Sequence, residues 1–326
     1  MSWSLFEGSD RDQPATAAVL ILGALAVLSF QDALVKFVAP HTSLWQFQIL
    51  RALFNLSFVA LILTMRRQLV LFLPRRPRAV AVRTVVMVTT MIFFFAGAPF
   101  LTLAEMGAGL YTYPIFNTAL SWLILRERVG PWRIGAVFLA AVGALLIIRP
   151  AANDFSAVQL LPVAAGFFYA VNSILLRGPC RAESPLTLAA WVGFGFLVAC
   201  GIGAVTVGTL DLSDDQRAAW PFLLNAWPGL TLFILGLAAL ASVCNVIGNV
   251  LIVKGYQSGE LSWLAPFDYS YLILATFWGY VLFAELPDQI AIAGMSLIAV
   301  GGILIAWREN SLKRRAGPTS SAGPMS

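Results

Sequence analysis

Residues 141–147 read AVGALLI and residues 299–305 read AVGGILI, so five of the seven positions are identical. The second copy follows the first at an offset of 158 residues in a chain of 326. The same offset aligns Glu127 with Glu285, each at the end of an apolar run. Chance similarity between apolar segments could explain the heptapeptide alone, but it explains the glutamates less well. The pattern therefore predicts that the chain consists of two related halves.

The composition requires a lipid environment. Hydrophobic residues make up 59% of the chain and charged residues 11%, against roughly 25% charged in ordinary globular domains. A helix crosses the bilayer with about 20 mostly apolar residues, and these apolar runs lack the alternation of barrel strands. Ten runs predict ten transmembrane helices, at approximately residues 17–38, 44–65, 79–99, 104–125, 132–149, 158–177, 186–208, 228–253, 260–283 and 288–307.

Each half of the repeat holds five of the predicted spans. Because five is odd, the two halves cross the membrane in opposite directions, an inverted repeat of the kind found in many secondary transporters. The expected fold is an all-α integral membrane protein with ten transmembrane helices as two inverted five-helix repeats. The expected parts are a cytoplasmic N-terminal segment, the two repeats and a basic cytoplasmic tail, at residues 1–16, 17–150, 158–307 and 308–326.

The basic residues predict the orientation. With the N-terminus inside, 16 of the 21 Lys and Arg residues fall on inside segments, and the outside loops hold only Arg149 and Arg217. Cytoplasmic loops carry such an excess, so both termini should be cytoplasmic, in the inner membrane. The net charge of +5 then indicates contact with lipid headgroups rather than with nucleic acid. The sixteen are Arg11, Arg66, Arg67, Arg75, Arg76, Arg78, Arg126, Arg128, Arg133, Arg177, Arg181, Lys254, Arg308, Lys313, Arg314 and Arg315.

Two tracts resemble a known family. The sequence PIFNTALSWLILRERVGPWRIGAVFLAAVGALLIIRP, at 114–150, is similar to the fourth and fifth helices of the drug/metabolite transporter superfamily in its EamA-type ten-helix branch. The sequence APFDYSYLILATFWGYVLFAELP, at 265–287, is similar to its ninth helix. The resemblance covers nearly the whole chain but specifies no substrate. A departure is the outside loop 209–227, which is longer than expected and which we interpret as solvated and partly interfacial.

Charges inside predicted spans are functional candidates. Asp32 and Lys36 are four residues apart on one helix face and can pair. Asp32 and Arg51 each lie about 10 Å below the outer end of a span, at ~1.5 Å per residue, so they can pair as well. Such pairs could equally serve only to join helices, and Lys36 could snorkel to the surface. Arg83, one turn inside its span, is expected to snorkel to the cytoplasmic headgroups.

Asp268 is the other unusual charge, roughly 12 Å from the cytoplasmic end of its span at 1.5 Å per residue. It could take up a proton, bind a cationic group or pair with a basic residue. Tyr111 and Tyr269 are related by the repeat offset. If the spans that hold them line a central cavity, as the resemblance implies, the polar groups converge on a midplane pocket, although intramembrane amides can also simply bind helices together. The expected substrate-binding residues are Asp32, Arg51, Tyr111, Asn117, Asn172, Asn245, Trp263, Asp268 and Tyr269.

Three classes of function are open to such a membrane protein: an enzyme, a channel or scaffold, and a transporter. A membrane enzyme usually needs acid/base or metal groups clustered at one membrane face, but His41 is the only histidine, and the three cysteines are scattered. A channel should show a repeated filter, which is absent from the sequence; a non-transporting scaffold stays open. We therefore expect no catalytic residue, no metal and no cofactor.

The favoured function is a secondary transporter, or permease, that moves a small polar or zwitterionic metabolite by alternating access. An amino acid, a riboflavin-like vitamin and S-adenosylmethionine are the substrates that the resemblance allows. The expected partners are this metabolite and membrane lipid, with protons as a candidate coupling ion. Uptake or efflux, and coupled transport or facilitated exchange, are left open by the sequence.

Overall fold

The computed structural model describes residues 14–65, 67, 72–123, 130–149, 156–257 and 264–316, and this part of the chain is helical, with no strand. Apart from the groups of its first and last turns, the backbone N–H and C=O groups of a helix are bonded within the helix, which is why lipid-exposed segments adopt this structure. The elements are α1 (Pro14–Val38), η2 (Ala39–His41), α2 (Leu44–Met65), α3 (Pro77–Ala96), α4 (Leu103–Leu110), α5 (Tyr113–Leu123), α6 (Pro131–Ile148), η4 (Ala157–Leu160), α7 (Leu161–Arg177), α8 (Pro185–Thr209), α9 (Asp214–Ala219), α10 (Pro221–Leu224), α11 (Leu232–Gln257), η5 (Ala265–Tyr269), α13 (Ser270–Phe283) and α14 (Gln289–Ala316).

Six described helices are long and apolar enough to cross a membrane, judged by length and composition. Two shorter apolar helices, Ile134–Ile148 and Gln289–Leu304, accompany them. These lengths support a multi-pass membrane protein. The six are Ala15–His41, Leu44–Met65, Pro77–Ala96, Ala157–Leu176, Pro185–Thr209 and Leu232–Ile252.

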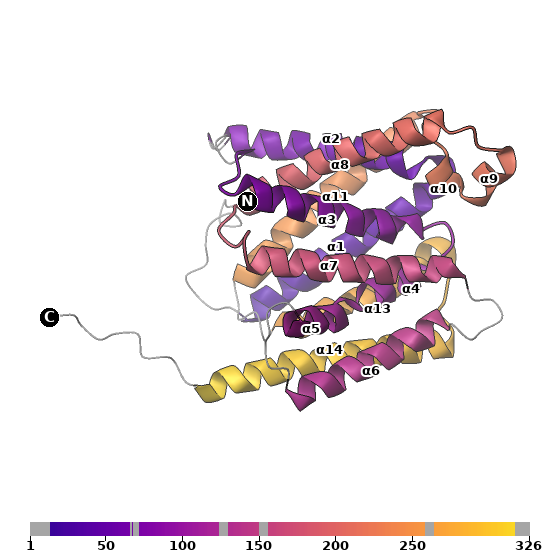
Figure 1. Ribbon diagram of the computed structural model, residues 1–326. Coiled ribbons are helices and arrows are strands. Elements are labelled where there is room, and N and C mark those ends of the chain that lie inside the picture. The colour runs from indigo at the N-terminus through magenta and orange to yellow at the C-terminus, as the bar shows by residue number, and fades with distance from the viewer. Residues whose placement is uncertain are drawn as a thin grey trace.

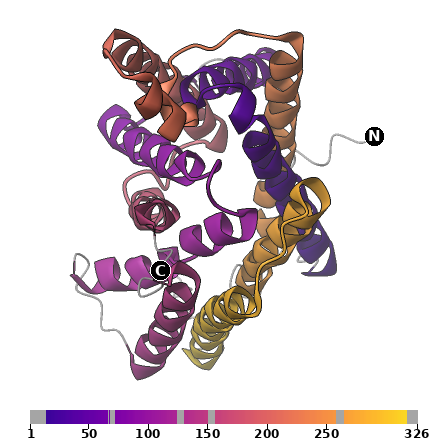
Figure 2. The same ribbon diagram turned by 90° about the vertical axis from the view of Figure 1, so that its right-hand side faces the viewer.

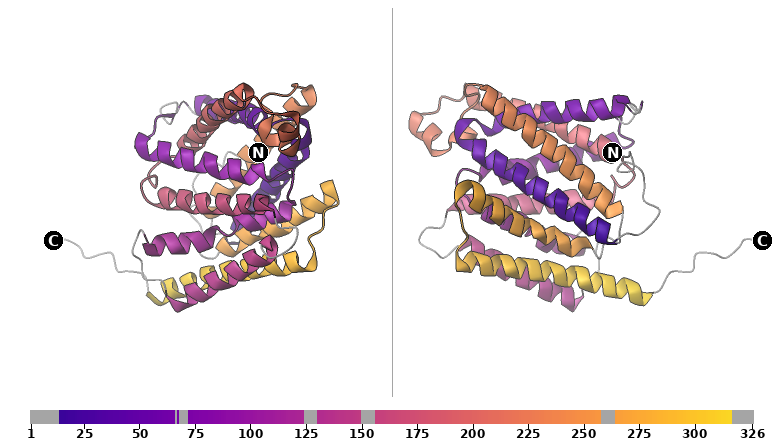
Figure 3. Two further views of the ribbon diagram at one scale, coloured as in Figure 1. Left: turned by 45° about the vertical axis from the view of Figure 1, so that its right-hand side comes forward. Right: turned by 180° about the vertical axis from the view of Figure 1, so that it is seen from behind.

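The helices form one bundle, in which α1 begins at the end where α14 finishes (Figure 1). Viewed along the bundle, α6 and α14 lie together at one edge and α2 and α8 at the opposite edge (Figure 2). Seen from behind, α1 runs beside α11 (Figure 3), and on the other side α3 contacts α7. The main core cluster includes residues of α1, α2, α4, α11 and α13.

Two of the predicted spans are interrupted. The run 104–125 was expected to be one helix, but Tyr111 and Thr112 form a turn between α4 and α5. The run 260–283 begins in the described residues as the 3-10 helix η5, which α13 continues. Proline lacks the N–H of a continuous helix and disfavours helical backbone before it; it stands as the second residue of both α5 and η5. The turn and the end of η5 occupy corresponding positions of the two halves.

Other boundaries differ less. α11 begins four residues later than the predicted 228 and ends at Gln257, and α14 extends into the predicted tail as far as Ala316. The loop 209–227, expected to be solvated and partly interfacial, contains α9, which has no buried residue, and α10, which buries Phe222. The Trp45 Nε1 donates to the Leu223 carbonyl at 2.7 Å. The loop therefore packs on the start of α2, which explains its length.

Small residues hold α6 against α14. A Cβ on Gly143 would lie 2.5 Å from the Gly294 carbonyl oxygen, and one on Gly301 would lie 2.7 Å from that of Ala136. Gly143 and Gly301 are the equivalent glycines of the two heptapeptides. Small residues allow helices in lipid to approach closely. The repeated heptapeptides thus contribute both sides of one helix contact.

Lys36 does not pair with Asp32 and does not snorkel. Its Nζ lies 2.6 Å from Glu285 Oε1 and donates to the Leu101 carbonyl at 2.7 Å. The Lys36 side chain is only 9% exposed, so neither of the alternatives open for Lys36, the pair with Asp32 or snorkelling, is seen. The ion pair joins α1 to the segment Ala284–Asp288 between α13 and α14, which we call the 284–288 segment.

A second ion pair anchors the other end of the 284–288 segment. Asp288 pairs with Arg149 at the end of α6, and its Oδ1 accepts from the Ala291 N–H at 2.8 Å in the first turn of α14. These hydrogen bonds lower the pKa of Asp288 below its ordinary value of 3.8. A lowered pKa contributes stability above the ordinary pKa that is lost as the pH falls through the folded value. At neutral pH the segment is therefore fixed at both ends.

Replacing Gly143 by valine should weaken the contact between α6 and α14. The new side chain would collide with the backbone at Gly294, and overpacking of this kind costs about 1–3 kcal/mol. The midpoint of thermal unfolding in detergent should fall. Gly135→Val on the same helix is the matched control, because nothing lies within 4 Å of its Cβ position. An equal effect of both substitutions would refute the contact.

Glu285→Gln should destabilise the protein, because it leaves the Lys36 charge without its counter-ion. We expect a loss of about 1–3 kcal/mol, below the value for fully buried pairs, because Glu285 is 28% exposed. Adding Lys36→Met should restore part of the loss, which the thermal unfolding midpoint of the double variant would report. A double variant that melts below Glu285→Gln would contradict the pairing.

Candidate functional site

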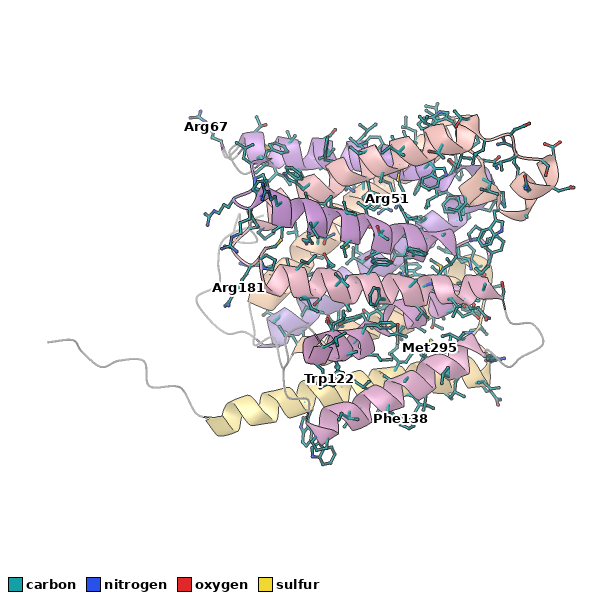
Figure 4. All side chains as sticks on the ribbon, in the orientation of Figure 1. Arg51, Arg67, Trp122, Phe138, Arg181 and Met295 are labelled. Atoms are coloured by element: carbon teal, nitrogen blue, oxygen red, sulfur yellow. The ribbon has the colours of Figure 1, made fainter. Side chains whose placement is uncertain are left out.

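A cavity of about 1070 Å³ lies between α1, α2, α3, α7, α8 and α11. Gln31 and Arg51 line its deep end. The cavity extends from there to the turn between α7 and α8, residues 178–184, and Lys254 at the end of α11 also lines it. Arg181 lies at that end of the bundle, whereas Arg51 lies inside it (Figure 4). The 284–288 segment is at the opposite end. The cavity therefore reaches one face, while two ion pairs hold the chain together at the other.

Asp32 is held by a hydrogen-bonded network that links three helices. The Tyr271 hydroxyl donates to Asp32 Oδ2 at 2.7 Å, and the Gln31 Nε2 donates to Oδ1 at 2.9 Å. The Gln31 Oε1 in turn accepts from Asn245 Nδ2 at 2.8 Å. A carboxylate inside the bundle is tolerated when donors satisfy it. This network fixes Asp32 just behind the wall of the cavity.

Arg51 stands at the deep end of the cavity. Its Nη1 donates to Gln48 Oε1 at 2.7 Å, and its guanidinium lies over the Phe95 ring at 5.5 Å. It interacts electrostatically with Asp32, but among the described residues the two make no direct ion pair. The Nε of Arg51 and the Nε2 of Gln48 are buried with no hydrogen-bond partner in the described part of the chain. The deep end thus presents donors to a possible ligand.

The interrupted helices meet in a cluster of tyrosines. The Tyr111 hydroxyl donates to the Asp268 carbonyl at 2.7 Å. The Tyr111 ring stacks on Tyr271 at 5.5 Å with an interplanar angle of 20°, and it also contacts Tyr269 at 5.5 Å. Tyr269 reaches α14 at Gly302, where any Cβ would overlap its ring. The cluster joins the two helix breaks directly.

The structure brings some predicted site residues together and separates others. Arg51 and Asn245 line the cavity, and Asp32 lies one hydrogen bond behind it. Tyr111, Asp268 and Tyr269 gather at the helix breaks, which is a neighbouring site. The remaining three are Asn172, buried on α7 with its Oδ1 unpartnered among the described residues, Asn117, half-buried on α5, and Trp263, which lies outside the described residues.

Several cavity residues are absent from the predicted set. Gln48 and Asn55 flank Arg51 at helical spacing on α2, and all three line the cavity. This spacing of polar residues within an apolar span was a usable signal. Arg83 lines the cavity as well, with its Nε and Nη1 buried. The expectation that Arg83 snorkels to the headgroups was therefore wrong.

The chain resembles proteins that are named as transporters. Residues 15–149 match the EamA-like transporter family. A riboflavin transporter of Vibrio cholerae is 30% identical over 206 residues, which cover 63% of this chain and 63% of that protein. The S-adenosylmethionine uptake transporter of Rickettsia bellii is 22% identical over 199 residues, covering 61% and 62%, and the pseudopaline exporter of Pseudomonas aeruginosa is 22% identical over 226 residues, covering 69% and 73%.

The match to the Vibrio cholerae relative spans less than two thirds of its length. A solved crystal structure of a protein has the same fold, with a TM-score of 0.58 and 17% identity, over 94% of this chain and 100% of that one. The family and its named relatives are transporters, not enzymes. Residues 15–149 therefore form an EamA-like domain, which confirms for this part of the chain the resemblance to the EamA-type branch of the drug/metabolite transporter superfamily seen in the sequence.

Proposed function

We propose that this protein is a secondary transporter that moves a small polar or zwitterionic metabolite across the inner membrane by alternating access. The observation that carries the proposal is the cavity of about 1070 Å³ in an all-helical bundle, open toward one face and bounded at depth by polar side chains. Its size is close to the upper end of the range of small-molecule sites, about 300–1,000 Å³. The names of the relatives support the same class of activity.

We propose further that residues 17–150 and 158–307 are inverted five-helix repeats within a ten-helix bundle. The helix contacts support this symmetry, because the main contacts have counterparts when the halves are exchanged. The contact of α1 with α11 corresponds to that of α7 with α3, and the contact of α2 with α11 to that of α8 with α3. Exchanging the halves leaves three contacts unchanged, those of α2 with α8, of α4 with α13 and of α6 with α14.

The mechanism would be a rocking motion of the two repeats about the cavity. In the conformation described, the cavity reaches the face of the 178–184 turn, and the Lys36–Glu285 and Arg149–Asp288 pairs close the other. Opening the second face would require these pairs to break. The interruptions at Tyr111 and Tyr269 would act as hinges, because broken helices at corresponding positions of two halves mark the moving site in many transporters.

Each group in the cavity has a proposed task. Arg51 and the amides of Gln31 and Asn245 would bind polar parts of the substrate, and Phe95 would contact its apolar part. Asp32 would balance Arg51, and Asp32 or Asp268 would carry a coupling proton. Asn117, Asn172 and Trp263 stay in the proposed binding set on the sequence argument alone. Membrane lipid surrounds the bundle in this proposal.

A riboflavin-like vitamin is the first substrate to test, followed by amino acids and S-adenosylmethionine. Several relatives carry the name riboflavin transporter, including proteins of Vibrio cholerae and Brucella anthropi. Cells that cannot make or import riboflavin should accumulate it when they express this chain. If they do not, an untargeted comparison of metabolites in cells with and without the protein identifies the substrate; no difference at all would refute transport.

Arg51→Gln should reduce the rate of transport by about 10- to 100-fold, the range expected for a lost charge-assisted hydrogen bond. Asp32→Asn should also reduce it, and the losses should not add in the double variant because the two charges interact. Arg217→Gln, which makes the same chemical change in α9, is the control. Parental transport by Arg51→Gln at normal protein level would exclude Arg51 from the site. Measuring the transport rate between pH 5 and 8 tests whether a proton is coupled to transport.

We propose that both termini and the segment 66–78 are cytoplasmic, on the basis of the basic residues. In a variant without native cysteines, Arg75→Cys should react with a membrane-impermeant thiol reagent only after permeabilisation. Asp211→Cys, between α8 and α9 on the opposite side, should react in intact cells. Labelling of position 75 from outside would reverse the orientation.

A further inference from the structure

The wall of the cavity carries an excess of positive charge. Among the described residues, four basic side chains line it, Arg51, Arg83, Arg181 and Lys254, against one acidic side chain, Glu183. The Glu183 carboxylate is already engaged, because its Oε1 accepts from the Arg76 N–H at 2.7 Å and its Oε2 from the Arg75 N–H at 3.1 Å. Glu183 thus caps the start of α3, where the helix dipole favours an anion. It does not neutralise the cavity.

Arg83 is the basic residue whose charge is least accounted for. Its Nε and Nη1 are buried and have no hydrogen-bond partner among the described residues. The titratable groups that interact with it are Cys180 and Tyr169, and side chains of both types are ordinarily neutral at pH 7. Two buried N–H groups of a charged side chain without partners are costly. Such a group at the wall of a cavity is typical of a site that receives its partner from outside.

Arg51 is itself a cation and cannot pair with Arg83, and it cannot bind the same anionic group as Arg83. It is balanced by Asp32 and lies over Phe95, twelve residues beyond Arg83 on α3. Twelve residues of helix correspond to about 18 Å. The two arginines therefore act at different depths of one cavity.

One face of α3 connects the two depths. Arg83, Met87, Met91 and Phe95 follow one another at intervals of four residues, and all four line the cavity. Residues four apart lie on the same face of a helix. The face offers a cation near the 178–184 turn and then an apolar strip of two methionines and a phenylalanine. Flexible methionines adapt to ligands of varied shape.

We propose that the transported substrate is an organic acid, whose carboxylate or phosphate binds Arg83 and whose apolar or aromatic body lies along Met87, Met91 and Phe95. This inference rests on the proposed transport function and specifies its substrate class. Arginine binds carboxylates and phosphates through paired N–H donors. An anionic lipid headgroup has the same chemistry as a free acid, so the test must separate the two sources.

The first experiment measures the charge of the cavity without any substrate. A single cysteine is placed at Val192, which lines the cavity one turn before Gly195, and Gly195 contacts Thr84, the neighbour of Arg83. The native cysteines are replaced. The rates of reaction with sulfonatoethyl and trimethylammonium-ethyl methanethiosulfonate are compared, each relative to a small free thiol. The anionic reagent should be favoured, and Arg83→Gln should reduce its advantage by about tenfold.

Two variants serve as controls for this ratio. Arg83→Lys should retain most of the anion preference, because it keeps the charge. Arg78→Gln, an exposed arginine on the same helix that does not line the cavity, should leave the ratio unchanged. An unchanged ratio in Arg83→Gln, or a preference for the cationic reagent in the parent, would overturn the proposal whether or not transport is ever observed.

The second experiment compares riboflavin with riboflavin 5′-phosphate, which differ only by the anionic group. Binding to the protein in nanodiscs is followed by flavin fluorescence. The phosphate form should bind about tenfold more tightly, and Arg83→Gln should remove this advantage while leaving riboflavin itself unaffected. Equal or tighter binding of riboflavin would refute the proposal. If neither flavin binds while the reagent ratio holds, the flavin assignment fails and the organic-acid class stands.

The lipid composition of the nanodiscs separates the two sources of anion. The phosphate advantage should persist in phosphatidylcholine and in mixtures with phosphatidylglycerol. If it disappears when phosphatidylglycerol is added, a lipid phosphate occupies Arg83, and the substrate proposal is wrong.

Discussion

A polypeptide inside a bilayer must satisfy its backbone hydrogen bonds without water, so the groups freed where a helix is interrupted need other partners nearby. Here a side chain at one interruption bonds the backbone of the other. The Tyr111 hydroxyl, at the break between α4 and α5, donates to the Asp268 carbonyl of η5, and the Thr112 hydroxyl donates to the Gly109 carbonyl at 2.6 Å. The stacked rings of Tyr111 and Tyr271 cover the junction. The Tyr111 hydrogen bond and the stacked rings therefore join the two interrupted helices directly at their breaks.

The same constraint governs the charges. Asp32 is surrounded by donors from Gln31 and Tyr271, and Lys36 is bonded to Glu285 and a carbonyl oxygen. Each of these groups could therefore be buried at tolerable cost. Arg83 differs, because two of its buried nitrogen atoms, Nε and Nη1, have no partner among the described residues, and Arg51 has one such atom. Departures of this kind are where function is expected.

Packing and binding are divided between different helices. The glycines of α6 and α14 bring these helices into close contact at one edge of the bundle, away from the large cavity. The cavity is lined instead by α1, α2, α3, α7, α8 and α11, where larger and polar side chains leave space. Among the described residues, α6 and α14 contribute none to its wall. This closely packed edge would keep the chain assembled during the proposed rocking motion.

The sequence alone determined the class of the protein, because hydropathy and charge act locally. Apolar runs of about 20 residues specify membrane helices whatever their neighbours, but the sequence did not predict the break at Tyr111, because it treated 104–125 as one helix. It also singled out Arg51 and Asn245, which the structure places at the wall of the cavity. The sequence could not show which groups the charged side chains contact. Lys36 had a carboxylate four residues away, yet it pairs with Glu285, 249 residues distant, because the rotation of α1 turns Lys36 toward α13. Arg83 faces the cavity rather than the headgroups for the same reason. A periodic pattern reports the face and depth of a side chain, but only the tertiary structure decides what that face meets.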